Sequence, residues 1–128
     1  MKKYLLLLLL ILCLSLTACN KKTDMKLRIK ESSWSGWTEG YEPEEKTDDY
    51  NVVLGKKYSI NSGKFKFKIT KINRKYIEIE TETPFSDKKD TIDLNSKKTK
   101  FIVYLEKELK LTTPTTDAGE IYYITLIK

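Results

Sequence analysis

Two segments in the middle of the chain alternate strictly between polar and apolar residues. Residues 64–69 read Lys-Phe-Lys-Phe-Lys-Ile, and residues 76–82 read Tyr-Ile-Glu-Ile-Glu-Thr-Glu. A period of two is the side-chain period of a half-buried β-strand, whereas a helix needs apolar residues three and four apart. A polar connection around residues 73–74 joins the two segments, which predicts a β-hairpin.

The predicted hairpin also explains the most basic part of the sequence. Residues 56–75 hold eight Lys or Arg residues and no acid. A register that pairs Ile69 with Ile77 and Phe67 with Ile79 buries one apolar face, which Phe65 extends. The other face then carries opposite-charge pairs, namely Lys68–Glu78, Lys66–Glu80 and Lys64–Glu82. We therefore predict a solvent-exposed face of paired charges and no nucleic-acid partner.

Other short apolar or alternating segments, separated by Gly, Pro, Asn and Asp, predict further strands. They are residues 26–30, 50–54, 58–60, 91–94, 101–105, 108–111 and 121–127. Strands this short and closely spaced favour an all-β fold. We predict a small antiparallel β-sandwich, immunoglobulin-like or similar, with a small open β-barrel as the alternative.

Three details of this strand pattern make further predictions. Residues 101–105 and 108–111 flank only two polar residues, which predicts a second hairpin. Residues 121–127 are apolar on both faces, as expected of a strand in the middle of the structure. Between these segments, Pro114 and Gly119 predict a turn.

The stretch from residue 31 to residue 49 lacks periodicity and is expected to form a long loop. Trp34, Trp37 and Tyr41 lie in it among glycines and acids. Exposed aromatic residues can form a platform for a sugar ring or anchor a partner protein, so these three are the candidate ligand-binding residues. The alternative is that the tryptophans cap the core. The acids lack the spacing of a calcium loop, so no metal site is predicted.

The composition excludes several classes of enzyme. The chain has no histidine and two cysteines, Cys13 and Cys19. A Ser-His-Asp or Cys-His arrangement is therefore impossible, and a histidine-rich zinc site is too. We predict no catalytic residue and no cofactor. A small carbohydrate-active enzyme that uses paired carboxylates is the alternative that composition leaves open.

The N-terminus has the order of a secretory signal. Lys2 and Lys3 precede an apolar stretch at residues 5–14, and small or polar residues follow. The apolar stretch is shorter than the roughly 20 residues that cross a membrane. Residues 16–19, Leu-Thr-Ala-Cys, resemble the bacterial lipoprotein signal. The resemblance implies cleavage before Cys19 and attachment of diacylglycerol and palmitate-type chains to this residue.

This resemblance sets the expected domain organisation and location. Residues 1–18 are a cleaved signal helix. Residues 19–49 are a lipid-anchored, flexible tether and the acidic loop, with a short strand at 26–30. Residues 50–128 are the β domain. Two or more acyl chains hold a protein stably on a membrane, so the expected location is the extracytoplasmic face of the cell membrane.

The expected function follows from location and composition together. We expect a non-catalytic binding or accessory module at the cell surface, whose partner is a surface protein or a cell-wall polymer. The alternatives are an inhibitor or immunity-type protein that blocks a secreted enzyme or toxin, and the small carbohydrate-active enzyme.

Overall fold

The computed structural model describes residues 3–4 and 22–128. Cys19 and most of the predicted signal helix at 1–18 lie outside these residues. Among the described residues, no helix has the length and hydropathy that are needed to cross a membrane.

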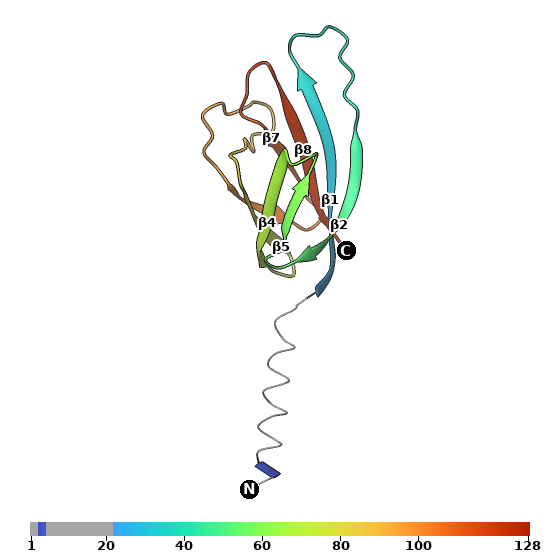
Figure 1. Ribbon diagram of the computed structural model, residues 1–128, viewed down its shortest axis with the longest axis vertical. Coiled ribbons are helices and arrows are strands. Elements are labelled where there is room, and N and C mark those ends of the chain that lie inside the picture. The colour runs from blue at the N-terminus through green and yellow to red at the C-terminus, as the bar shows by residue number, and fades with distance from the viewer. Residues whose placement is uncertain (1–2, 5–21) are drawn as a thin grey trace.

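Residues 22–127 form eight β-strands in two sheets (Figure 1). The strands are β1 (Lys22–Ser35), β2 (Lys46–Val53), β3 (Lys57–Ile60), β4 (Phe65–Ile72), β5 (Tyr76–Thr81), β6 (Lys100–Tyr104), β7 (Glu108–Thr112) and β8 (Ala118–Ile127). Sheet A has the order β2-β1-β8-β7 and sheet B has the order β3-β4-β5-β6. All neighbouring strands within the two sheets are antiparallel, and the sheets do not close into a barrel. The predicted β-sandwich is confirmed, and the barrel alternative is not.

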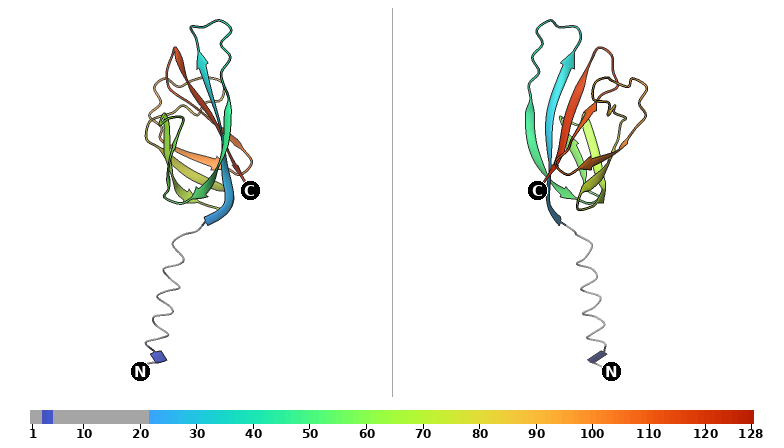
Figure 2. Two further views of the ribbon diagram at one scale, coloured as in Figure 1. Left: turned by 45° about the vertical axis from the view of Figure 1, so that its right-hand side comes forward. Right: turned by 180° about the vertical axis from the view of Figure 1, so that it is seen from behind.

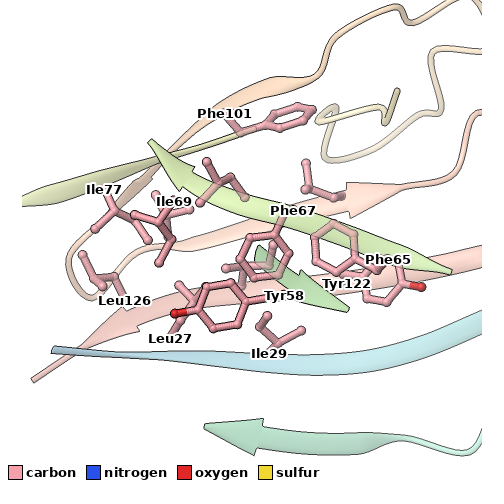
Figure 3. Packing of buried hydrophobic residues seen from close by; sticks show 14 of the residues in the cluster. Leu27, Ile29, Tyr58, Phe65, Phe67, Ile69, Ile77, Phe101, Tyr122 and Leu126 are labelled. Atoms are coloured by element: carbon pink, nitrogen blue, oxygen red, sulfur yellow. The ribbon is translucent and has the colours of Figure 1, made fainter. Parts of the chain in front are cut away.

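Alternate residues of the strands bury one apolar core between the sheets (Figure 3). The buried apolar side chains all belong to the span from Met25 to Leu126. Within the described part of the chain, residues 22–128 therefore supply every side chain of this core. The predicted central strand is confirmed as well, since β8 lies between β1 and β7 and buries Tyr122, Ile124 and Leu126.

Aromatic rings join the two sheets in the middle of this core. Tyr58 of β3 stacks on Phe67 of β4, with 4.9 Å between ring centroids. Phe65 lies 5.0 Å from Phe67 on one side and stacks on Tyr122 of β8 at 4.3 Å on the other. The chain of rings thus runs from sheet B into sheet A, and aromatic pairs of this kind add stability beyond the area that they bury.

The β4–β5 hairpin forms as predicted, but the predicted register is wrong by two residues. Ile69 pairs with Ile79 rather than with Ile77. A bulge at Thr70 shifts the register again, so that Ile72 pairs with Ile77. A shift of two residues leaves every side chain on its predicted face.

The faces of this hairpin therefore agree with the prediction although its cross-strand pairs do not. The predicted apolar face is confirmed, because Phe65, Phe67, Ile69, Ile77 and Ile79 are each at most 2% exposed. On the outer face, Lys68 opposes Glu80, and Lys66 lies 4.0 Å from Glu82.

The second predicted hairpin is wrong. Strands β6 and β7 are consecutive, but β6 pairs with β5 in sheet B and β7 pairs with β8 in sheet A. Inward-facing side chains of both strands, such as Phe101 and Leu111, are buried in the shared core. The connection at residues 105–107 is short enough for a hairpin but here crosses between the packed sheets, so the packing decides which of the two forms.

Two other segments differ from the prediction. The strand expected at 26–30 is part of the longer β1. The loop expected over 31–49 is confined to residues 36–45, because residues 46–49 pair with β1 and β1 itself stays paired with β8 up to Ser35. Residues 91–94, predicted as a strand, have no strand structure and belong to an irregular connection between β5 and β6.

Truncation of adjacent residues on opposite faces of β4 tests this packing. We expect Phe67→Ala to lower the free energy of unfolding by about 3–5 kcal/mol, because it leaves a cavity beneath Tyr58 and Phe65. Lys66→Ala removes only an exposed ion pair and should cost less than about 1 kcal/mol. Urea denaturation of residues 20–128 measures both. Similar costs for the two variants would contradict the assignment of faces.

Candidate binding site at the open end of the sandwich

Sheet A extends beyond sheet B at the end of the sandwich where β1 finishes (Figure 2). Strands β1 and β8 stay paired up to Ser35 and Ala118, whereas β3 and β4 turn back at residues 61–64. The inner face of sheet A is therefore uncovered here. The side chains on it line an open groove of about 540 Å³ together with residues of the 36–45 loop.

The groove begins where the inward-facing rows of sheet A change from apolar to polar. In β1, the row that buries Leu27 and Ile29 continues with Glu31, because side chains two apart in a strand share a face. In β8, the row that buries Tyr122 continues with Glu120. Both carboxylates thus point from sheet A into the groove.

A polar network closes the base of the groove. The Lys64 ammonium forms an ion pair with Oε1 of Glu120 at 3.1 Å. The Asn61 side-chain amide donates to Oε2 of Glu120 at 3.3 Å and to the Tyr122 hydroxyl at 3.1 Å. Asn61 adopts a positive φ of 54° in the β3–β4 turn, which asparagine tolerates better than most residues. This network fixes the turn of sheet B against β8 of sheet A.

Burial changes the acid–base behaviour of the tyrosine in this network. Burial raises the pKa of Tyr122 to about 12, and the nearby Glu120 carboxylate adds to this rise, while the hydrogen bond from Asn61 opposes it. The hydroxyl therefore stays protonated and neutral at the base of the groove at physiological pH.

The three aromatic residues that the sequence singled out lie in different environments. The Tyr41 hydroxyl lies in the groove, 2.6 Å from the Ser33 hydroxyl. Trp34, on β1, also borders the groove and is partly buried. Trp37 is 78% exposed in the 36–45 loop and is not among the residues that line the groove. The two tryptophans thus do not share one environment.

Trp34 packs on the turn between β7 and β8. It pairs with Gly119, and a Cβ atom at Gly119 would lie 2.9 Å from the indole nitrogen and 2.1 Å from the Thr113 hydroxyl. A turn lies at Pro114 as predicted, but Gly119 belongs to β8 rather than to this turn, and it is required for the close approach rather than for a positive φ. The indole nitrogen is buried and has no hydrogen-bond partner among the described residues.

Most of the groove residues were not identified from the sequence. Glu42 and Glu44 belong to the loop whose acids were considered only as calcium ligands and were set aside. Glu31, Ser33 and Glu120 come from strands. Glu31 and Ser33 continue the alternation that turns Met25, Leu27 and Ile29 toward the core, and this alternation was the only sequence signal for them. Nothing in the sequence placed Glu120 beside them.

The arrangement can bind polar groups but offers no metal site. Among the described residues, no three His, Cys, Asp or Glu side chains are grouped so that they could hold a metal ion. The groove presents carboxylates and hydroxyls, and a lysine already paired with a carboxylate.

The chain was also compared with known proteins. No family model, no curated protein and no solved structure matches it.

The contrast between the tryptophans gives a testable prediction. Trp34→Ala should lower the free energy of unfolding by about 3 kcal/mol, because Trp34 packs on the 113–119 turn. Trp37→Ala should change it by less than about 0.5 kcal/mol, since its side chain is exposed. Urea denaturation measures these effects. As a control, iodide should quench the remaining tryptophan of Trp34→Phe strongly and that of Trp37→Phe weakly.

The raised pKa of Tyr122 predicts a stability change in alkali. An unfolded tyrosine has a pKa of about 10, so the folded state holds this proton more tightly than the unfolded state. The stabilisation is complete below pH 10 and is lost as pH rises towards about 12, a change of about 3 kcal/mol. Urea denaturation at several pH values across this range should show that the free energy of unfolding falls more steeply with pH for the native protein than for Tyr122→Phe. Equal slopes would contradict the assignment.

Proposed function

We propose that this protein is a lipoprotein anchored to the extracytoplasmic face of the cell membrane through Cys19, and that it acts as a non-catalytic binding module. The observation that carries the proposal is the position of the groove. It lies at the end of β1 opposite to Lys22, the residue at which β1 begins. Figure 1 shows how far β1 extends between these two ends. At about 3.3 Å per residue, the 14 residues of β1 separate the two ends by roughly 40 Å.

The chemistry of the groove indicates the kind of partner. Glu31, Glu42 and Glu44 contribute carboxylates, and Ser33 and Tyr41 contribute hydroxyls. Such a surface attracts ammonium or guanidinium groups and pairs with hydroxyl groups. The partner is a basic segment of a surface protein or an amino-bearing cell-wall polymer.

The groups in the groove do not support a serine nucleophile activated by a lysine. A serine nucleophile needs a base within hydrogen-bonding reach. Ser33 instead bonds to the Tyr41 hydroxyl, and the Lys64 side chain forms an ion pair with Glu120. The groove therefore lacks an evident Ser-Lys pair.

Replacement of Cys19 tests the membrane anchor. Cys19→Ala removes the thiol that would carry the lipid, so fatty-acid labelling and membrane association should both be lost. The control is Cys13→Ala, which alters the other cysteine and should leave both unchanged. Membrane association of Cys19→Ala equal to that of the native chain would overturn the lipoprotein assignment.

Matched glutamate variants of the 36–45 loop test the groove. Glu42→Gln/Glu44→Gln removes two carboxylates that line the groove, whereas Glu39→Gln/Glu45→Gln removes two exposed ones that do not. Each exposed ion pair contributes up to about 1 kcal/mol. The first variant should therefore bind its partner up to about thirtyfold more weakly, and the second should bind normally.

The measurement for these variants is retention of cell-envelope components on immobilised residues 20–128. A component retained by the native domain and by Glu39→Gln/Glu45→Gln, but lost from Glu42→Gln/Glu44→Gln, identifies the partner. Equal retention by all three proteins would show that the groove is not the binding site.

The protruding β1–β2 hairpin favours a second function, inhibition of a secreted enzyme or toxin. Its 36–45 loop is the most distant part of the sandwich from Lys22, and Trp37 stands exposed in it (Figure 2). An exposed tryptophan on a projecting loop suits insertion into a partner's cleft. In this case Trp37→Ala should abolish inhibition of extracellular hydrolases without affecting stability, and the Glu42→Gln/Glu44→Gln variant should still inhibit.

A further inference from the structure

The end of the sandwich opposite the groove is formed by three turns and the last described residue. We call it the basal end and define it as residues 54–56, 73–75, 105–107 and Lys128. Its parts are joined: Lys22 pairs with Val53, and the Leu105 amide donates to the carbonyl of Lys75 at 2.8 Å. Arg74 and Lys128 line a hollow beside Met25. The views in Figures 1 and 2 agree that this end of the sandwich lies beside the start of β1.

Exposed bases predominate at the basal end. These five bases are Lys56, Arg74, Lys75, Lys107 and Lys128, whereas the exposed acids at this end are Glu106, in the third turn, and Asp24, beside the hollow. Among the described residues, none of these five forms an ion pair with a carboxylate. The ammonium groups of Lys56 and Lys107 instead lie over the rings of Tyr58 and Tyr104, at 5.1 and 5.9 Å from their centroids. Leu54, 52% exposed, lies in the first of the three turns.

The opposite end has the opposite charge. Acidic residues surround the groove and its loop, namely Glu31, Glu39, Glu42, Glu44, Glu45, Asp117 and Glu120. The molecule is therefore electrically polarised along β1, with its basic end where the chain would meet the membrane.

The other basic surface of the domain is less suited to an anionic partner. On the outer face of sheet B, Lys68 opposes Glu80, and Lys66 lies near Glu82. Lys57 opposes Lys68 directly, but Glu80 follows in the same cross-strand row. Carboxylates thus lie among the lysines of that face, whereas none of the five basal bases forms an ion pair.

We propose that the basal end docks on an anionic lipid surface and so holds the groove away from the membrane. The role of this docking in orienting the groove rests on the proposed attachment through Cys19, which places the same end beside the bilayer. Each basic residue near an anionic leaflet strengthens binding about fivefold. Leu54 adds an apolar side chain that can enter the interface between headgroups and acyl chains.

Vesicle sedimentation of residues 20–128 tests the docking without the acyl chains proposed on Cys19. The fragment lacks Cys19, so failure of docking and failure of the lipoprotein assignment remain distinguishable. We expect binding to vesicles that contain phosphatidylglycerol at low salt, weakening at high salt, and no binding to vesicles of phosphatidylcholine alone.

Matched pairs of variants locate the contact. Arg74→Gln/Lys75→Gln should weaken binding on the order of 25-fold, since two basal charges are lost. Lys89→Gln/Lys97→Gln makes the same change in net charge on the exposed 82–99 connection and should have little effect. A second basal pair, Lys56→Gln/Lys107→Gln, provides an independent reading, and circular dichroism confirms that each variant is folded.

Three outcomes would overturn the proposal. If the basal and control pairs weakened vesicle binding equally, binding would depend on net charge alone and not on the basal end. Equal binding to both kinds of vesicle would remove the role of anionic headgroups. Unchanged vesicle binding by both basal variants, with lost binding to a soluble glycerol-phosphate polymer, would assign the basal end to a polymer instead of a membrane.

Discussion

The contact between Phe65 and Tyr122 is the interaction on which the rest of the sandwich depends. Phe65 belongs to sheet B and Tyr122 to sheet A, so their stacked rings fix the position of one sheet against the other. The Tyr122 hydroxyl then receives a hydrogen bond from Asn61, which holds the β3–β4 turn at the edge of the core. Because Glu120 binds both Asn61 and Lys64 of that turn, the base of the groove is positioned by the same contact.

The groove is a direct consequence of strand geometry. One row of side chains in β1 first fills the core with Leu27 and Ile29 and then lines the groove with Glu31 and Ser33. No special element is needed to present these polar groups, because the pleat of the strand aims them at the side that sheet B leaves uncovered. A binding site on paired strands is also more rigid than one on a loop alone.

The two ends of the sandwich carry opposite charges. Unpaired bases gather at the basal end, and carboxylates gather at the groove. The two proposed contacts, one with an anionic membrane and one with a cationic partner, therefore use opposite ends and do not compete for the same residues. Repulsion between the acidic end and an anionic bilayer would favour the same orientation.

The sequence by itself determined the class of fold and the faces of its clearest strands. Alternation in residues 64–69 and 76–82 was enough to place five apolar side chains in the core, because the period of two is a local property of the extended chain. Tertiary structure decided the rest. The register of β4 and β5 depends on a bulge at Thr70, and the separation of β6 and β7 into different sheets depends on which partners bury Phe101 and Leu111. The groove joins Glu31 and Tyr41 to Lys64 and Glu120 from distant parts of the sequence, and such contacts are fixed only when the two sheets pack on one core.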